Sequence, residues 1–230
     1  MLDHIRRRLK SIRHKKWVGD TYTAFAQRER EQLLLSICRF CHINRPIDGY
    51  YMEFGCYGAH TMRLAWKHTQ YLFNWTYVAF DSFEGLPEIQ EIDRQAIWSK
   101  GKLAMSREDF IRLVTAAGMP RDRLITVKGF YDRRLPVGIC ALKSKAAVIY
   151  IDCDLYTSTV PILAFIPPFL QPGTIVVFDD WNCFLADPDR GERRAWREFR
   201  ASHPELHFEP FVSTSGAQSF IFTGDSITCP

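Results

Sequence analysis

The sequence predicts an α/β fold organised around a doubly wound, mostly parallel β-sheet. Short apolar stretches typical of buried strands alternate five times with stretches of helical periodicity. Two further strand-like stretches then follow each other across a polar turn at residues 213–216, which predicts an antiparallel hairpin at one edge of the sheet. Five parallel strands and this hairpin together make a Rossmann-like sheet of seven strands, with helices on both faces.

Each of the five expected parallel strands is followed closely by a glycine or an acid. The stretches 146–151 and 174–178 are apolar throughout, which is typical of central strands covered on both faces. The expected strands, in chain order, cover residues 49–54, 75–80, 124–127, 146–151, 174–178, 207–212 and 218–223.

Helices are expected between these strands and ahead of the first one. Apolar residues recur at helical spacing over residues 20–43, and Ser106 is a typical N-cap followed by acids in the first turn. Residues 84–105 lack a clean period, and an irregular segment of that length in a compact domain is typically functional or disordered. The expected helices cover residues 20–43, 59–71, 106–117, 158–170 and 190–202, the fourth being shortened by its prolines.

The net charge of +4 is concentrated at the N-terminus. Residues 1–16 hold seven basic residues against Asp3, a net charge of +6, which leaves −2 for the rest of the chain. We expect residues 1–45 to form a basic arm and a helical cap, and residues 46–230 to form the main domain. The arm is read as a solvated terminal helix that helps to cover a site; contact with nucleic acid or an anionic membrane is the alternative.

Composition also bears on location. No apolar run approaches the roughly 18 residues that a membrane span needs, and the first residues do not resemble a secretory signal. The seven cysteines are scattered and odd in number, as expected for reduced thiols. The sequence therefore predicts a cytoplasmic protein.

The turn after the first strand is the first candidate for ligand binding. It runs from Glu53 to Gly58 and contains Gly55, so the backbone can approach a ligand closely. It lacks the third glycine of a dinucleotide fingerprint, and Glu53 favours a cationic ligand over a phosphate. Asp81, at the end of the second strand, suits hydrogen bonds to ribose hydroxyls, although a turn aspartate is an equal alternative.

Four carboxylates follow the fourth and fifth strands. Asp152 and Asp154 come after one apolar strand, and Asp179 and Asp180 come after the next. Carboxylates so close repel one another, so a shared proton, basic partners or a divalent cation must compensate. Oxygen ligands without Cys or His suit Mg²⁺, Ca²⁺ or Mn²⁺. The alternative is a set of capping aspartates fully open to water.

These motifs occur together in an order that resembles the macrocin O-methyltransferase family, over residues 49–185. The motifs that carry the resemblance are Tyr51-Met52-Glu53-Phe54-Gly55, Phe80-Asp81-Ser82-Phe83-Glu84-Gly85-Leu86-Pro87, Lys128-Gly129-Phe130-Tyr131-Asp132 with Leu135-Pro136, Asp152-Cys153-Asp154-Leu155-Tyr156-Thr157-Ser158-Thr159 and Asp179-Asp180-Trp181. The sequence departs from the family pattern at Asp132-Arg133-Arg134, and residues 88–104 match nothing firmly.

The resemblance implies a class I methyltransferase domain at residues 46–230 that uses S-adenosylmethionine and Mg²⁺ or another hard divalent cation. It implies metal ligands at Asp152, Asp179 and Asp180, and a general base at Asp154, although Asp152 and Asp154 could exchange roles. The cofactor-binding residues that follow from it are Glu53, Gly55, Tyr57, Gly58, Asp81, Ser82, Gly129, Phe130 and Asp152.

The expected activity is therefore methyl transfer to a hydroxyl of a small molecule, a sugar or a natural-product scaffold. Two alternatives stay open: another Rossmann-type nucleotide-cofactor enzyme, and a non-catalytic nucleic-acid-binding protein that uses the basic arm. Nucleic acid is not the expected partner, because the body carries no basic face beyond the arm. The N-terminal helix could serve a homo-oligomer.

Overall fold

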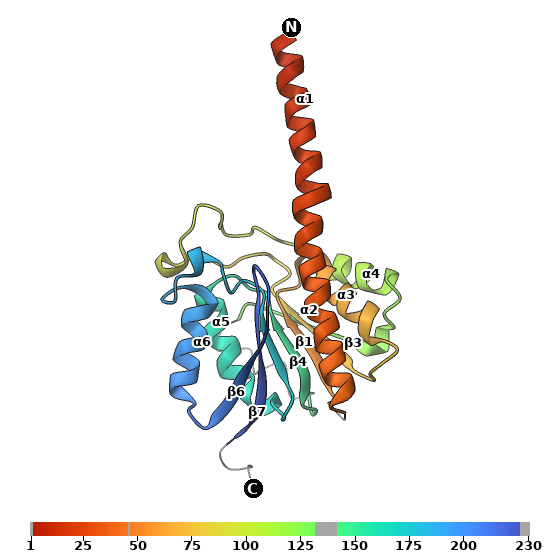
Figure 1. Ribbon diagram of the computed structural model, residues 1–230, viewed down its shortest axis with the longest axis vertical. Coiled ribbons are helices and arrows are strands. Elements are labelled where there is room, and N and C mark those ends of the chain that lie inside the picture. Colours follow the sequence, from red (N-terminus) through yellow and green to blue (C-terminus); the bar gives the residue numbers. More distant parts are fainter. Residues whose placement is uncertain (1, 46, 132–141, 226–230) are drawn as a thin grey trace.

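The computed structural model describes residues 2–45, 47–131 and 142–225, and its centre is one seven-stranded sheet (Figure 1). The strand order is β3-β2-β1-β4-β5-β7-β6, with β1 to β5 parallel and β7 antiparallel to both of its neighbours. The predicted doubly wound sheet with an antiparallel edge hairpin is confirmed. The strands are β1 (Tyr50–Phe54), β2 (Thr76–Asp81), β3 (Leu124–Lys128), β4 (Ala146–Ile151), β5 (Ile175–Phe178), β6 (Leu206–Ser213) and β7 (Gln218–Asp225).

The switch point of the sheet lies between β1 and β4. From β1 the chain proceeds outward to β2 and β3, and then returns to the other side of β1 to form β4 and β5. Because these five strands are parallel, their carboxyl ends meet at one edge of the sheet. Ligands of doubly wound sheets bind at that edge, beside the switch point.

Helices cover both faces of the sheet (Figure 1). Side chains alternate along each strand, so Tyr51 packs with α2, α3 and α4 on one face, whereas Met52 packs with α5 and α6 on the other. The helix α5 begins at Tyr156, earlier than predicted, and ends before Pro167 and Pro168. The helices are α2 (Ala24–Ile43), α3 (His60–Thr69), α4 (Arg107–Ala116), α5 (Tyr156–Phe165) and α6 (Gly191–Ser202).

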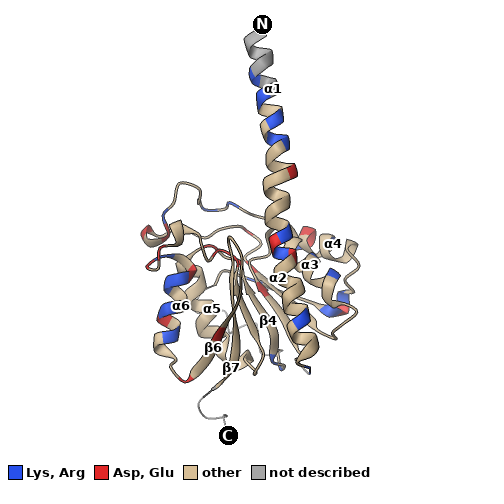
Figure 2. Ribbon diagram, in the orientation of Figure 1, with Lys and Arg blue, Asp and Glu red and all other residues tan. Residues whose placement is uncertain are grey.

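The N-terminal region is helical from its start. The helix α1 (Leu2–Trp17) passes through a π-helical turn, Val18–Thr23, into α2 and projects from the body (Figure 1). It carries most of the basic arm (Figure 2). The expectation that this arm covers a site is wrong for α1, because the helix points away from the sheet. The boundary near residue 45 stays a prediction.

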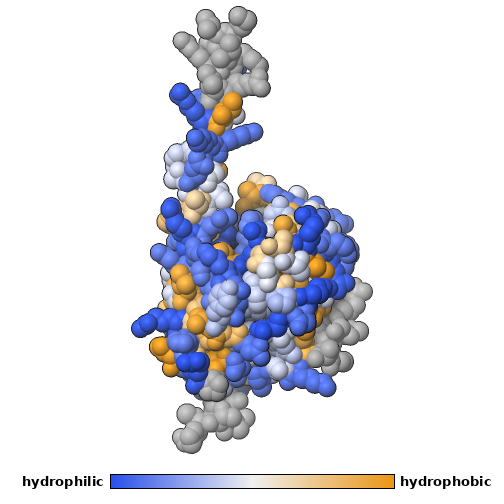
Figure 3. Space-filling model, turned by 90° about the vertical axis from the view of Figure 1, so that its right-hand side faces the viewer, coloured by the Kyte–Doolittle hydropathy of each residue, from blue (hydrophilic) through white to orange (hydrophobic). Residues whose placement is uncertain are grey.

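In contrast to α1, α2 belongs to the core. Its buried face packs against α3 and the sheet through Leu33, Leu34, Ile37, Cys38 and Cys41. On the side of the molecule shown in Figure 3, apolar side chains lie in small groups among hydrophilic ones. Across the described ranges, no helix is both long and apolar enough to span a membrane.

The segment between β2 and α4 is irregular, as predicted, apart from a single-turn 3₁₀ helix at Glu91–Asp93. It runs across the carboxyl edge of the sheet from β2 towards α5 and α6 (Figure 1). The motif residues Asp132, Leu135 and Pro136, and the departures Arg133 and Arg134, lie outside the described residues.

Candidate functional site

A cavity of about 580 Å³ opens at the carboxyl edge of the parallel strands. Its size is typical of small-molecule sites. Residues at or just after the ends of all five parallel strands line it, together with the first turns of α2, α3 and α5 and the irregular segment before α4. It is lined by Thr23, Ala26, Gln27, Arg30, Gly55, Tyr57, His60, Thr61, Asp81, Ser82, Gly85, Leu86, Pro87, Glu88, Gln90, Leu103, Gly129, Phe130, Tyr131, Asp152, Cys153, Asp154, Thr157, Ser158 and Asp180.

The turn after β1 packs tightly against the end of β4. Gly55 has a φ of +89°, and a Cβ built there would lie 1.7 Å from the carbonyl oxygen of Asp152. Its N–H donates to the carbonyl oxygen of Phe80 at 3.0 Å. Only glycine therefore fits where the ends of β1, β2 and β4 converge.

Asp81 serves as a turn residue at the rim of the cavity. Its two carboxylate oxygens accept the backbone N–H groups of Cys56 and Phe83, each at 2.6 Å. Burial raises the pKa of the Asp81 carboxyl above its ordinary value. The prediction that Asp81 is a turn aspartate is confirmed. Its binding of ribose hydroxyls stays a prediction, because each carboxylate oxygen has a further lone pair that could accept a hydrogen bond.

Most of the predicted cofactor residues line the cavity, and two do not. Gly55, Tyr57, Asp81, Ser82, Gly129, Phe130 and Asp152 line it, whereas Glu53 and Gly58 do not. Glu53 is 1% exposed and accepts a hydrogen bond from the Tyr51 hydroxyl at 2.9 Å, on the face covered by α2. Burial raises the pKa of Glu53 to about 8. Its role as a cofactor ligand stays a prediction.

The raised pKa of Glu53 predicts a pH-dependent stability. The folded protein holds this proton more tightly than the unfolded chain, so the associated stability is lost as the pH rises from about 4.5 to about 8. Glu53→Gln keeps the acceptor for Tyr51 without the charge. The free-energy advantage of the variant should be near zero at pH 4 and grow by at most about 1.4 kcal/mol per pH unit. Denaturant unfolding of both proteins across this range measures it; a constant difference contradicts it.

The predicted carboxylate cluster forms at the ends of β4 and β5. These strands are neighbours, and Ile151 pairs with Phe178 at their last register position. One carboxylate oxygen from each of Asp152, Asp179 and Asp180 lies within 4.8 Å of the others. Burial and the neighbouring carboxylates raise the pKa of Asp152 and of Asp180 well above the ordinary range. The strand ends therefore concentrate negative charge at one point.

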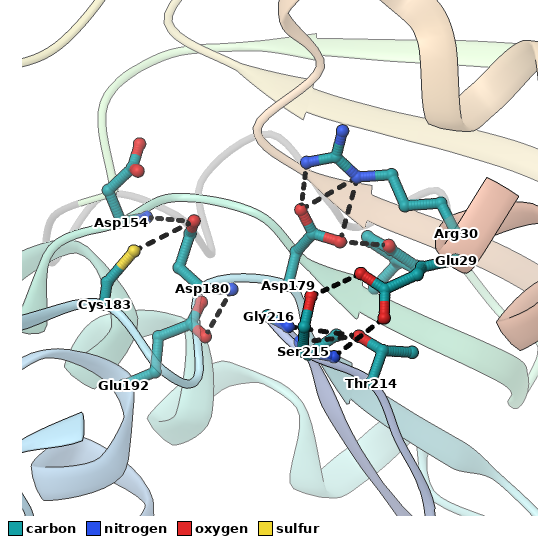
Figure 4. Close-up of polar contacts among 12 residues, drawn as sticks. Glu29, Arg30, Asp154, Asp179, Asp180, Cys183, Glu192, Thr214, Ser215 and Gly216 are labelled. Carbon is teal, nitrogen blue, oxygen red and sulfur yellow. Dashed lines mark hydrogen bonds and ion pairs between the residues drawn. The ribbon is translucent and has the colours of Figure 1, made fainter. Parts of the chain in front are cut away.

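Asp179 has a basic partner in the helix α2. Arg30 of α2 forms an ion pair with it, and the Arg30 Nε lies 3.0 Å from Asp179 Oδ2 (Figure 4). The Tyr150 hydroxyl also donates to this carboxylate. Asp154 and Asp179 are each 7% exposed, so the reading of capping aspartates fully open to water is wrong for these two.

Asp154 faces the cavity from the same cluster. Its backbone N–H donates to Asp180 Oδ2 at 3.0 Å (Figure 4). One oxygen of its own carboxylate lies within 4.8 Å of a carboxylate oxygen of Asp180 and of Cys183 Sγ. Its φ of +61° is in the left-handed region, which aspartate tolerates better than most residues. Burial, followed by the charge of Asp152, raises the pKa of Asp154 to about 7.

Four further residues contact these carboxylates and were not among the predicted site residues: Arg30, Tyr150, Cys183 and Glu192. Glu192 lies in the first turn of α6, is 1% exposed, and accepts the Asp180 backbone N–H at 3.1 Å (Figure 4). This hydrogen bond ties the backbone of Asp180 to the start of α6. Arg30 and Glu192 are charged residues on amphipathic helices, and no sequence signal separates them from solvent-facing neighbours.

The donor set of the cluster fits a hard divalent cation. Asp152, Asp179 and Asp180 offer carboxylate oxygens only, the ligands that Mg²⁺ and Ca²⁺ prefer. A cation coordinated by Asp179 would share that carboxylate with Arg30 and Tyr150. Asp152 and Asp180 also line the cavity, so a cation held there would border it.

Comparison with known proteins agrees with this architecture. A relative from Streptomyces olivaceus, 8-demethyl-8-(2,3-dimethoxy-alpha-L-rhamnosyl)-tetracenomycin-C 4'-O-methyltransferase, is 34% identical over 107 residues. This match spans 44% of the chain and only 40% of the relative's length. The O-methyltransferase NovP is similar in structure, with a TM-score of 0.66 at 22% identity over 86% of this chain and 79% of its own. A calicheamicin methyltransferase gives 0.69 at 22% identity over 90% and 85%.

The family model described as Macrocin-O-methyltransferase (TylF) matches residues 12–208. That range includes α2, the cavity and the carboxylate cluster, and it extends the resemblance seen in the motifs on both sides. The chain belongs to the macrocin O-methyltransferase family.

Proposed function

We propose that this protein is an S-adenosylmethionine-dependent, Mg²⁺-assisted O-methyltransferase. One observation carries the proposal. In a member of this family, a single cavity is bordered on one side by the glycine turn and Asp81 and on the other by a cluster of three carboxylates. The first suits a nucleoside cofactor, and the second suits activation of a hydroxyl.

The cofactor half of the cavity lies at the ends of β1, β2 and β3. Gly55 allows close approach of the backbone, Asp81 would accept the ribose hydroxyls, and Phe130 offers a half-exposed ring for the adenine. The charge of the cavity favours S-adenosylmethionine, which carries a sulfonium and an ammonium group. Its described lining holds five carboxylates and a single guanidinium, that of Arg30.

The acceptor half lies at the ends of β4 and β5. Asp152, Asp179 and Asp180 would hold the cation, which when bound lowers the pKa of a substrate hydroxyl. Asp154 would take the proton of that hydroxyl, with Asp152 as the alternative base. The cavity walls would align the acceptor oxygen with the methyl group for in-line displacement, and alignment of this kind supplies much of the rate.

The names of the relatives suggest the acceptor. The Streptomyces olivaceus relative is named for a rhamnosyl group on tetracenomycin C. The calicheamicin methyltransferase also carries the name TDP-rhamnose 3'-O-methyltransferase. We therefore propose a hydroxyl of a deoxysugar, free or attached to a natural-product scaffold, as the methyl acceptor.

Calorimetric titration distinguishes this function from another Rossmann-type enzyme. We expect S-adenosylhomocysteine to bind in the micromolar range and NADH not to bind. Tight binding of NADH alone would overturn the proposal. Retention on RNA that salt weakens, and that deletion of residues 1–16 abolishes, would favour the nucleic-acid-binding alternative. A cytoplasmic location and a homo-oligomer stay predictions.

A further inference from the structure

Asp93 is buried in a part of the chain that is otherwise mostly exposed. Its exposed fraction is 0%, whereas its neighbours Glu91 and Arg94 are exposed. It belongs to the irregular segment of residues 86–103, which contributes Leu86, Pro87, Glu88, Gln90 and Leu103 to the cavity wall. A buried carboxylate in a segment without regular structure requires partners, and those partners indicate what the segment rests on.

The partners of Asp93 are the first residues of α5. Asp93 Oδ1 accepts the N–H of Tyr156 at 2.8 Å, and Oδ2 accepts the N–H and the hydroxyl of Thr157 at 3.1 and 2.6 Å. The residue at the N-cap position of α5 is Leu155, which has no polar side chain to fill this role. Asp93 thus caps α5 from 63 residues away, and its negative charge lies at the positive end of the helix.

A second contact fastens the same part of the segment. Arg190 Nη2, at the start of α6, donates to the carbonyl oxygens of Ile92 at 3.2 Å and of Arg94 at 2.9 Å, on either side of Asp93. The base of the segment is closed by paired hydrogen bonds between Leu86 and residues 101 and 102, at 2.9 and 2.8 Å. The segment is therefore closed on itself at residues 86 and 101–102, and it is attached at residues 92–94 to the starts of α5 and α6.

The anchor point lies beside the reacting side of the cavity. Thr157 lines the cavity together with Asp154, three residues earlier in the chain. Because Asp93 bonds to Thr157, the wall that includes Glu88 and Gln90 is set at a fixed distance from the proposed base. The cofactor half, at the ends of β1 to β3, does not depend on this bond.

We propose that Asp93 is a positioning residue, which fixes the segment 86–103 as the acceptor-side wall of the cavity by capping α5. The acceptor part of this inference rests on the proposed function. Asp93→Ala should therefore speed amide hydrogen exchange throughout residues 86–103. It should raise the KM for an acceptor such as p-nitrophenyl α-L-rhamnoside about tenfold, as expected for the loss of roughly one cap. The affinity for S-adenosylhomocysteine should not change.

Two variants serve as controls. Asp93→Asn keeps one of the two accepting oxygens and should recover part of the slow exchange and of the low KM that Asp93→Ala loses. Glu91→Ala removes an exposed acid of the same 3₁₀ helix, whose ion pair is with Arg94, and should behave as wild type. If Asp93→Ala does not fold, Arg190→Met removes the second fastening and should speed exchange over the same residues.

The outcomes separate the inference from the function on which it rests. A lower Tm in Asp93→Ala with unchanged exchange over 86–103 and unchanged acceptor KM overturns the inference, because Asp93 would then only cap α5. If exchange in Arg190→Met also matches wild type, the same conclusion holds. If the wild type methylates no rhamnoside, the proposed acceptor fails, whereas faster exchange in Asp93→Ala still supports the anchoring of the segment.

Discussion

Replacing Asp179 and Asp180 together by asparagine is expected to lower kcat by at least about 100-fold, the scale on which loss of electrostatic stabilisation acts. Asparagine is nearly isosteric with aspartate but brings no charge, so two of the three negative charges proposed to hold the cation are lost. The cofactor half lies at the ends of β1 to β3, and the affinity for S-adenosylhomocysteine should stay close to that of wild type. Steady-state kinetics and calorimetry measure the two effects separately.

The single variant Asp180→Asn controls for a loss of activity that results only from destabilised folding. Asp179 is the ion-pair partner of Arg30, so the double variant also leaves that guanidinium without its carboxylate. Asp180 accepts the backbone N–H of Asp154, and an asparagine oxygen can still do so. The single variant should therefore keep the Tm of wild type and still lose activity. Wild-type activity in the double variant would exclude a metal role for this cluster.

Asp154→Asn is also expected to lower kcat strongly. Removal of a general base typically costs about 100- to 10,000-fold in rate. We expect a loss of kcat in that range with little change in the binding of either substrate, because Asp154 would act on the proton that leaves during the reaction. Asparagine also tolerates the left-handed backbone at this position, where φ is +61°.

The matched control for Asp154→Asn is Asp189→Asn. Asp189 lies in the loop after the cluster, and its side chain is 71% exposed in an ion pair with Arg197. Its substitution should leave kcat unchanged. If Asp154→Asn turns over at the wild-type rate whereas Asp152→Asn does not, the base is Asp152, and the two residues exchange the roles proposed for them.

The carboxylate cluster could be predicted from the sequence because it depends only on topology. Parallel strands end at the same edge of a sheet, so acids that follow neighbouring strands must meet there. The partners of the cluster could not be predicted in this way. Arg30 lies 149 residues from Asp179, and nothing in its helix distinguishes it from exposed basic residues such as Arg28.

The surroundings of Glu53 and Asp93 could not be predicted from the sequence. Strand alternation turns the Glu53 side chain towards the α2 layer, so it does not line the cavity, and its expected role as a cofactor ligand stays a prediction. Asp93 lies in a segment without periodicity, so no pattern relates it to a helix 63 residues later. The terminal helix expected for the basic arm is confirmed as α1, and the helix expected over residues 20–43 begins at Ala24, after a π-helical turn that no sequence pattern indicated.

The metal dependence of methyl transfer is the sharpest test of a Mg²⁺-assisted O-methyltransferase. Purified protein is treated with EDTA and assayed with S-adenosylmethionine and a rhamnoside acceptor, with and without added Mg²⁺. We expect methylated product with Mg²⁺, loss of product after EDTA treatment, and recovery when Mg²⁺ is restored. An equal rate of methyl transfer in the presence of EDTA would contradict this expectation.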